Sequence, residues 1–160
     1  MQLTELQEIS FAEEENTQRV YVDFRIRGNA LDPANVSKWL NLEPSRSWAK
    51  GDNYTGKMRN PKTNEIVTTS RKRLWGLWVS SSNNMVISKR VEDHMVYLLS
   101  KLEQKQQKLS RYLDSPEVYT VSFYVHWEPR LEYGSFELSG KIMARLGALC
   151  HHTEFAWLQA

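Results

Sequence analysis

The sequence contains a single cysteine, Cys150, among its 160 residues. One cysteine excludes an intramolecular disulfide framework and is typical of a reducing compartment. No stretch approaches the roughly 20 consecutive apolar residues that a membrane-spanning helix needs. Residues 1–16 lack the basic start and apolar run of a signal peptide, and the glycine-rich spacing of a phosphate-binding loop is absent as well. We therefore expect a cytoplasmic protein that does not insert into a membrane.

Net charge is also small, because 21 Lys and Arg residues stand against 19 Asp and Glu residues, giving +2 at pH 7. This total does not by itself indicate nucleic acid or an acidic membrane as the partner. The basic residues are nevertheless concentrated in one segment, where only Asp52 and Glu65 oppose them. The segment contains Arg46, Lys50, Lys57, Arg59, Lys62, Arg71, Lys72 and Arg73. The chain is thus electrically uneven along its length.

A composition of 41% hydrophobic and 25% charged residues fits one globular domain with a proper core. Residues 1–17 are acidic and show no core pattern, so we expect a mobile N-terminal arm. Residues 18–160 are predicted to form a single α+β domain. Its segment 45–73 is rich in turn formers and poor in apolar periodicity, which predicts an extended basic loop or hairpin.

In the first half, apolar and polar residues alternate from Arg19 to Arg27, which predicts a half-buried strand. Asp32 and Pro33 are typical of a helix start, and the helix is expected to run to about Asn41. Val36, Trp39 and Leu40 mark its buried side. Further on, Ile66–Ser70 and the apolar run Leu74–Val79 are predicted as strands.

In the second half, Ser88 is expected to cap one long helix that reaches about Leu113. Alternation from Val118 to Trp127 predicts a strand, and 128–135 is expected to be a loop. Ser139 is expected to cap a helix whose buried side carries Ile142, Met143, Leu146 and Leu149. A closing strand is predicted over Thr153–Leu158.

The two ends of the chain have similar patterns. A strand, a loop, a capping residue and apolar helix positions follow one another around Asp32, and they recur with the same spacing around Ser139. This repetition predicts an α+β fold with two β-α-β units, a ferredoxin-like pseudo-repeat, joined by a long helix. All helices are then expected to pack on one face of the sheet.

The order of these motifs resembles a bacterial-type family of uncharacterised proteins, domain of unknown function 4279, over about residues 18–158. The motifs that carry the resemblance are Phe24-Arg25-Ile26-Arg27-Gly28, Leu31-Asp32-Pro33, Leu40-Asn41-Leu42-Glu43-Pro44, Lys50-Gly51-Asp52, Gly76-Leu77-Trp78, Phe136-Glu137-Leu138-Ser139 and Leu146-Gly147. The resemblance implies a cytosolic single domain with a repeated α+β fold. It implies no activity and supplies no catalytic residues.

The basic segment also contains aromatic residues, and Arg and Trp often anchor protein partners. We therefore expect a non-enzymatic module that binds a protein partner, with no cofactor. The expected contact residues are Arg46, Trp48, Lys50, Asp52, Tyr54, Arg71, Arg73 and Trp75. An alternative is single-stranded nucleic acid, because cations neutralise phosphates and rings stack on bases. Exposed edge strands would also allow a homodimer.

A second alternative is a metal or thiol enzyme centred on Cys150 and His152. On one strand, Cys150, His152 and Glu154 would point to the same side, and His126 could approach from another strand. Contiguous Cys-His-His is not the usual spacing of structural zinc ligands, and adjacency in sequence does not establish a catalytic dyad. We therefore expect no metal site and no catalytic residue.

Overall fold

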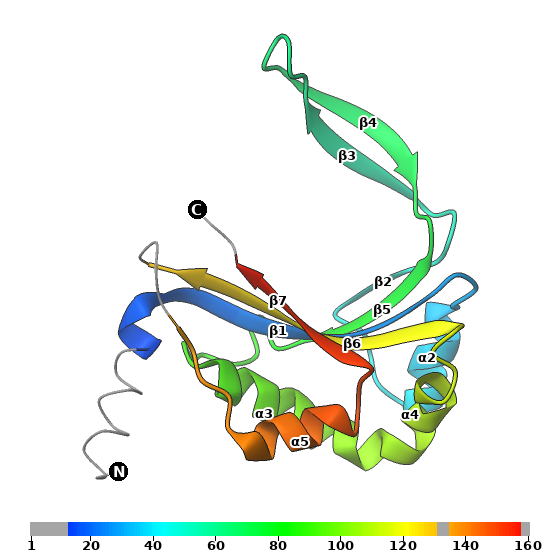
Figure 1. The fold of residues 1–160 in the computed structure, drawn as a ribbon. Coiled ribbons are helices and arrows are strands. Elements are labelled where there is room, and N and C mark those ends of the chain that lie inside the picture. Colours follow the sequence, from blue (N-terminus) through cyan, green and yellow to red (C-terminus); the bar gives the residue numbers. More distant parts are fainter. Residues whose placement is uncertain (1–12, 131–134, 158–160) are drawn as a thin grey trace.

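The computed structural model describes residues 13–130 and 135–157, which form a five-stranded mixed sheet and a separate two-stranded sheet (Figure 1). The strand order of the large sheet is β2-β5-β1-β6-β7, and β3 pairs with β4 in the small one. The strands are β1 (Thr17–Gly28), β2 (Arg46–Trp48), β3 (Asn53–Arg59), β4 (Ile66–Lys72), β5 (Gly76–Ser81), β6 (Tyr119–Pro129) and β7 (His152–Trp157). The helices are α2 (Pro33–Leu40), α3 (Val91–Leu102), α4 (Gln106–Leu113) and α5 (Gly140–Gly147). The fold is α+β, as predicted.

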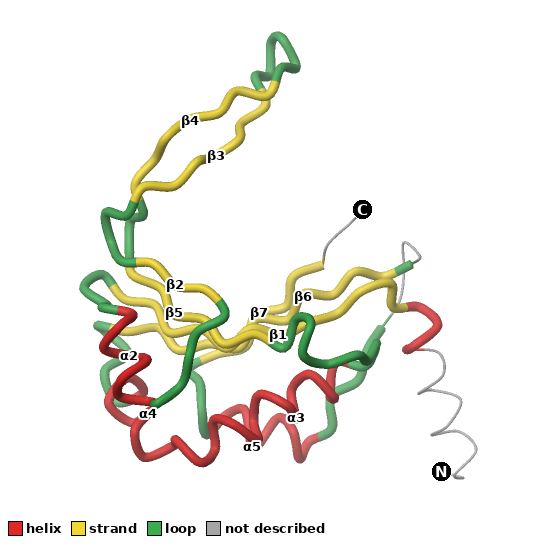
Figure 2. The backbone as a smooth tube through the Cα atoms, turned by 180° about the vertical axis from the view of Figure 1, so that it is seen from behind, coloured by secondary structure: helices red, strands yellow, loops and turns green. Residues whose placement is uncertain are grey.

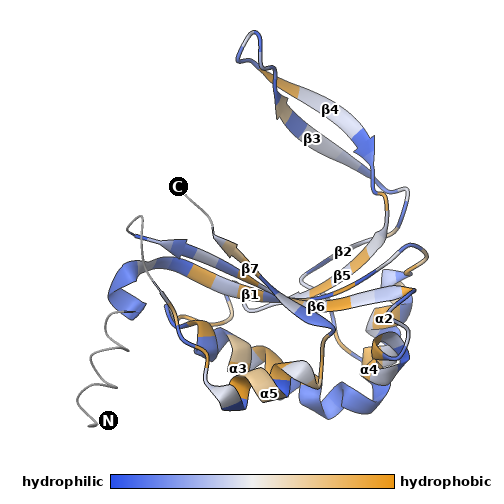
Figure 3. Cartoon of the chain, viewed as in Figure 1, coloured by the Kyte–Doolittle hydropathy of each residue, from blue (hydrophilic) through white to orange (hydrophobic). Residues whose placement is uncertain are grey.

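One face of the large sheet is covered by these helices, and the other face is open (Figures 1 and 2). The predicted alternation explains this, because every second residue of β1 and β6 points into the core. These residues are Val20, Val22, Phe24 and Ile26 on β1 and Val121, Phe123, Val125 and Trp127 on β6. Figure 3 shows hydrophobic residues along the strands of the large sheet and along α3 and α5. The intervening polar residues therefore form the open face.

Helix α2 begins and ends as predicted. The Asp32 side chain accepts a hydrogen bond from the Ala34 N–H, and Asn41 takes the left-handed conformation (φ 52°) that ends the helix. The prediction that Trp39 is buried is wrong, because 44% of this residue is exposed. Its indole lies over the boundary with α4, where Nε1 donates to the Lys108 carbonyl oxygen at 2.9 Å.

The prediction of one long helix from about residue 88 to Leu113 is wrong, since a 3₁₀ turn at Glu103–Lys105 separates α3 from α4. This turn redirects the chain so that α3 packs on β1 and α4 packs on β6. The cap also differs from the prediction: the N-cap position is Arg90, and Ser88 accepts from its N–H instead. No helix in the described parts of the chain has the length and apolarity to cross a membrane.

The two predicted β-α-β units differ in strand pairing. In the second unit β7 lies parallel and adjacent to β6, and α5 between them is capped by Ser139 as predicted. In the first unit β2 and β1 run in the same direction, but β5 lies between them and pairs antiparallel with both. A ferredoxin-like pseudo-repeat therefore stays a prediction. Met143, expected on the buried side of α5, is 54% exposed.

The predicted N-terminal arm lies mostly in residues 1–12, outside the described residues. The described part is attached to the body. Residues 13–16 are helical, and the Glu13 carboxylate accepts a hydrogen bond from the Val91 N–H at 3.0 Å. Thr17 begins β1 and accepts a bond from Trp127 Nε1. Of the predicted loop 128–135, β6 includes residues up to Pro129, and 131–134 are not described.

Candidate functional site

The β3–β4 hairpin, called the arm below, stands away from the rest of the molecule and leans over the open face of the sheet (Figures 1 and 2). The sequence predicted an extended loop or hairpin within 45–73, and in this segment β3 pairs antiparallel with β4. At its tip Asn60 donates to the Glu65 carbonyl oxygen at 2.8 Å, and Asn64 turns the chain with a φ of 60°. A two-stranded hairpin with no sheet or helix behind it is only marginally stable in water. Contacts at its base are therefore needed to orient it.

The arm has two chemically different faces. The paired residues Tyr54 and Arg71, Gly56 and Thr69, and Met58 and Val67 share one face. Arg71 Nη2 contacts Met58 Sδ across this face. The opposite face carries Lys57, Arg59, Ile66 and Lys72, and all four are exposed. The first face is aromatic and apolar with one arginine, and the second is dominated by cations.

The base of the arm is an arginine between two aromatic rings. The Arg73 guanidinium lies 3.8 Å from the Trp48 ring centroid and 4.0 Å from the Tyr54 ring centroid. Trp48 projects from β2 on the open face of the large sheet, since it pairs with Leu77 and through it with Arg27. Tyr54 belongs to the aromatic face of the arm. The Trp48–Arg73–Tyr54 stack thus joins that face and the open face into one continuous surface.

At the centre of the open face lies a carboxylate that is completely buried. Asp23 Oδ2 accepts from Arg46 Nη2 at 2.6 Å, from His126 Nε2 at 3.0 Å and from Arg25 Nη2 at 3.1 Å. The Asp23 side chain has 0% exposure, whereas that of Arg46 is 45% exposed. Asp23 therefore attaches the short edge strand β2 to the centre of the sheet.

The pKa of Asp23 is low despite its burial. Desolvation raises the pKa, but interactions with His126, Ser81, Arg46 and Arg25 outweigh it and lower the pKa to about 2. Asp23 is consequently a carboxylate at any physiological pH. Its Oδ1 and the Nε of Arg25 have no hydrogen-bond partner among the described residues.

Rings and guanidinium groups alternate around this centre. The ring centroids of Tyr21 and His126 are 4.1 Å apart, and those of Tyr124 and His126 are 4.6 Å apart. Arg25 lies 3.7 Å from the centroid of Tyr124. Two further arginines lie over aromatic rings. The guanidinium carbon of Arg19 is 5.1 Å from the Tyr21 ring centroid, and that of Arg27 is 5.2 Å from the Trp75 ring centroid.

We call the whole array the Arg–aromatic surface. It comprises Arg19, Tyr21, Arg25, Arg27, Arg46, Trp48, Tyr54, Arg71, Arg73, Trp75, Tyr124 and His126. The aliphatic parts of the arginine side chains cover apolar residues of the open face. Val79, for example, is fully buried between Arg25 and Arg46. A guanidinium group can form paired hydrogen bonds with a carboxylate or phosphate and can stack on an aromatic face.

The structure brings six of the eight predicted contact residues into the Arg–aromatic surface. These are Arg46, Trp48, Tyr54, Arg71, Arg73 and Trp75. The other two stabilise the loop between β2 and β3, since Lys50 Nζ donates to Asn29 Oδ1 at 2.6 Å and Asp52 accepts from the Ala49 N–H at 2.8 Å. Sequence reasoning missed the contributions of β1 and β6. The polar residues that alternate with apolar ones from Arg19 to Arg27 could have indicated the contribution of β1. Polar residues in such a pattern are usually only solvated, however, so the pattern alone does not indicate a binding surface.

The residues considered for metal or thiol chemistry do not converge on one centre, since Cys150, the His152–Glu154 pair and His126 each have different partners. Cys150 Sγ lies 3.2 Å from the Leu146 carbonyl oxygen, His152 bonds Glu154, and His126 bonds Asp23. Burial raises the pKa of the Cys150 thiol, which makes it a poorer nucleophile. Over residues 13–130 and 135–157, no group of three or more His, Cys, Asp or Glu side chains could hold a metal ion.

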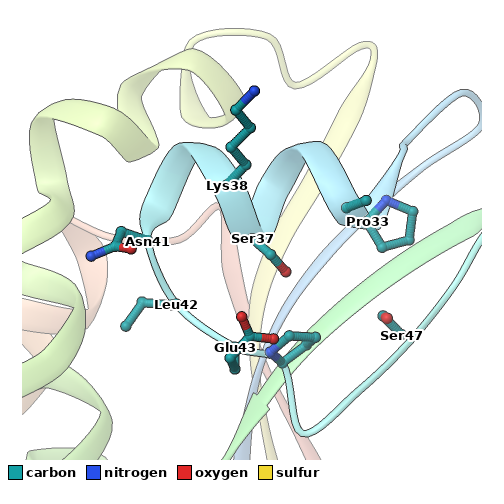
Figure 4. Close-up of a pocket in the computed structure, with 9 residues that line it drawn as sticks. Pro33, Ser37, Lys38, Asn41, Leu42, Glu43 and Ser47 are labelled. Atoms are coloured by element: carbon teal, nitrogen blue, oxygen red, sulfur yellow. The ribbon is translucent and has the colours of Figure 1, made fainter.

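A groove of about 580 Å³ lies elsewhere, between α2 and the segment that leads into β2 (Figure 4). Ser37, Lys38 and Glu43 are among the residues that line it. The Ser37 hydroxyl already accepts a hydrogen bond from the buried Trp78 Nε1 at 3.0 Å. This groove is lined by solvated helix and loop residues and offers no buried reactive group, so the Arg–aromatic surface is the stronger candidate.

Comparison with known proteins gives one family match. The family model described as a domain of unknown function (DUF4279) matches residues 18–157. The match includes both the arm and the open face of the sheet. No curated protein and no solved structure matches the chain.

Proposed function

This chain belongs to the DUF4279 family, whose description names no activity, and from its surface we propose that it is a non-enzymatic module that binds an acidic protein partner through the Arg–aromatic surface. The proposal retains the predicted class of function and enlarges its site. The arm contributes Tyr54 and Arg71, the open face contributes the residues of β1, β2 and β6, and Arg73 and Trp75 lie between β4 and β5.

The continuous alternation of guanidinium groups and rings across two sheets carries this proposal. Arginine, tryptophan and tyrosine are the residues that most often dominate the binding energy of protein interfaces. Contacts within the protein restrain part of this set before binding, because Arg25 packs on Tyr124, Arg73 packs on Trp48, and Asp23 bonds both Arg25 and Arg46. Such preorganisation lowers the entropic cost of association.

The positive charge of the arginines in the Arg–aromatic surface favours an acidic partner. The cations of the Arg–aromatic surface are arginines, which form bidentate bonds with carboxylates. Lys57 and Lys72 instead lie on the opposite face of the arm. The exposed apolar residues Met58 and Val67, 48% and 45% exposed, favour a protein over a purely polyanionic ligand.

The experiment that tests this proposal is quantitative affinity purification with the tagged full chain, from a lysate of the organism that carries the gene. Three baits are compared: the wild type, Arg71→Gln/Arg73→Gln, and the control Lys57→Gln/Lys72→Gln. The two variants remove the same charge from opposite faces of the arm. We expect an enriched protein of low isoelectric point whose capture falls at least tenfold in the arginine variant and less than twofold in the lysine variant.

The captured protein is then purified and its affinity for the three baits is measured directly. Equal losses in both variants would mean that the attraction is unspecific, because opposite faces of the arm would contribute alike. Retention of binding by Arg71→Gln/Arg73→Gln would exclude this surface as the contact. Circular dichroism of each bait checks that the fold is unchanged.

Single-stranded nucleic acid is a second candidate, and the stacked rings favour it. Tyr21, His126 and Tyr124 form an aromatic platform on the sheet, and arginines beside it could neutralise phosphates. Titration of tryptophan fluorescence with oligo(dT) and oligo(U) at low and moderate salt discriminates the two. Saturable quenching that weakens steeply with salt would replace the protein-binding proposal by this one, and a flat response would remove nucleic acid.

We also propose two further properties, a cytoplasmic location and a ferredoxin-like pseudo-repeat. A cytoplasmic location is supported by the single unpaired Cys150. The ferredoxin-like pseudo-repeat is supported by the equivalent roles of Asp32 and Ser139, because each side chain accepts from a main-chain N–H in the first turn of its helix. The thiol and metal alternative gains no support from the geometry around Cys150.

A further inference from the structure

Within the described residues, β3 and β4 pair only with each other, so each has an outer edge. Hydrogen bonds join Arg73 N–H to Asp52 O and Asn60 N–H to Glu65 O at the two ends of the hairpin. Bonded and non-bonded pairs alternate in an antiparallel ladder. The main-chain groups that point outward are therefore those of Asn53, Thr55, Lys57 and Arg59 on β3 and of Ile66, Thr68, Ser70 and Lys72 on β4.

The β4 edge is the one suited to pairing with another strand. Natural edge strands are protected by charged side chains, above all by lysine. On β3 the outward positions include Lys57 and Arg59, and Gly56 weakens the strand. On β4 the only charged outward residue is Lys72, at the end of the strand near the body, whereas Ile66, Thr68 and Ser70 are uncharged. Four of the seven residues of β4 are β-branched: Ile66, Val67, Thr68 and Thr69.

We propose that β4 pairs through this outer edge with an extended, acidic strand of the partner protein. This inference rests on the proposed function and specifies how the partner binds. Main-chain bonds to Thr68 and Ser70 provide the register. Alternate side chains of the added strand lie beside Val67 and Arg71 on the aromatic face, so acidic residues there meet a guanidinium group. The strand thereby extends the arm and borders the Arg–aromatic surface.

A second copy of this chain is a poorer occupant of the same edge. Pairing two β4 strands would bring two copies of the basic arm together, with Arg71 and Lys72 on each. Like charges on neighbouring strands are destabilising. An acidic strand removes this repulsion, and the charge of the arm therefore selects a different protein over self-association.

The test uses a defined probe, a ten-residue peptide of alternating glutamate and valine, on the full-length protein. Amide hydrogen exchange is followed residue by residue with NMR. We expect protection of the outward Thr68 and Ser70 amides to rise at least tenfold with peptide, while the inward Thr69 and Arg71 amides, already bonded to β3, change little. A peptide with glutamine in place of glutamate is expected to bind at least tenfold more weakly.

Two variants separate the main-chain contact from the charge. Thr68→Pro removes the outward N–H without removing a β3–β4 bond, and Thr68→Ala is its control. We expect only the Thr68→Pro variant to lose peptide binding. Failure to detect binding at millimolar peptide, binding without protection of Thr68 and Ser70, or equal binding by both variants overturns strand addition. The proposed function would still stand if the captured partner required Arg71 and Arg73 but not the Thr68 N–H.

Discussion

At the scale of single residues, Asp23 contributes most to the candidate surface. Its carboxylate is buried, and the Oδ2 atom alone accepts bonds from β2, β1 and β6. Removing the charge would leave Arg25 and Arg46 without a common anchor. The stability of the fold and the order of the surface are therefore coupled at this position.

Asp23→Asn is expected to lower the free energy of unfolding by about 2 kcal/mol at pH 7, because a charged acceptor of several bonds is lost. The folded-state pKa of Asp23 is lowered from 3.8 to about 2. Its contribution is therefore fully present above pH 4 and is lost as the pH falls toward 2. Urea unfolding of both proteins at pH 7 and at pH 2.5 should show the difference shrinking at the lower pH.

The exposed Asp114 supplies the control for this experiment. Asp114→Asn is expected to change the free energy of unfolding by less than about 0.5 kcal/mol at pH 7. A difference between wild type and Asp23→Asn that is the same at both pH values would show that the ionised carboxylate is not the cause.

Gly76 is required where β5 passes the loop before α2. A Cβ at this position would clash with the main-chain carbonyl of Leu31. We expect Gly76→Ala to destabilise the fold by about 2 kcal/mol, since backbone must move to relieve the overlap. Thermal unfolding measures this, with Gly140→Ala as the control because a Cβ there meets nothing within 4 Å. Equal melting temperatures for the two variants would contradict the packing argument.

At the scale of elements, α3 is connected to the end of β5 through a buried histidine. His94 Nδ1 lies 2.8 Å from Ser82 Oγ, and His94 Nε2 lies 2.9 Å from the Ser88 carbonyl oxygen. Burial lowers the pKa of His94 below 6.5. Folding therefore favours the neutral form of the His94 ring over the protonated form.

This arrangement makes stability depend on pH in a predictable direction. As the pH falls through 6.5, the unfolded chain takes up a proton at His94 before the folded chain does, so the free energy of unfolding decreases. We expect His94→Gln to be less stable at pH 7.5 but to lose less stability between pH 7.5 and 5.0 than the wild type. Urea midpoints at the two pH values provide the measurement, and an undiminished pH effect in the variant would assign it to another group.

At the scale of the whole molecule, the arm is an insertion between two strands that pair with each other. β2 and β5 flank it and are adjacent in the large sheet, where β5 also pairs with β1. A break in the arm therefore leaves every contact of the large sheet intact. The body and the arm should behave as separable parts of one chain.

Limited trypsin digestion tests this separation. The exposed Arg59 and Lys62 near the tip of the arm are the expected sites of first cleavage. We expect two fragments on a denaturing gel that elute together in size exclusion and retain the circular dichroism of the intact protein. Dissociation of the fragments, or earlier cleavage within the helices, would contradict the structure described above.

Local patterns in the sequence determined much of the fold. The alternation in β1 and β6, the caps at Asp32 and Ser139, and the hairpin between residues 45 and 73 depend on neighbours in the chain, so short stretches were sufficient to predict them. Six of the predicted contact residues lie in the Arg–aromatic surface for the same reason, since they are close together in one segment, and their contact with a partner stays a prediction.

Only the tertiary structure decided what these elements form together. Asp23 and His126 are far apart in sequence, and no local pattern brings β6 beside β1. The break between α3 and α4 depends on where the sheet offers apolar surface, and the exposure of Trp39 depends on the position of α4. Contacts between distant segments are set by how the elements share one core, and for that reason the Arg–aromatic surface became visible only in three dimensions.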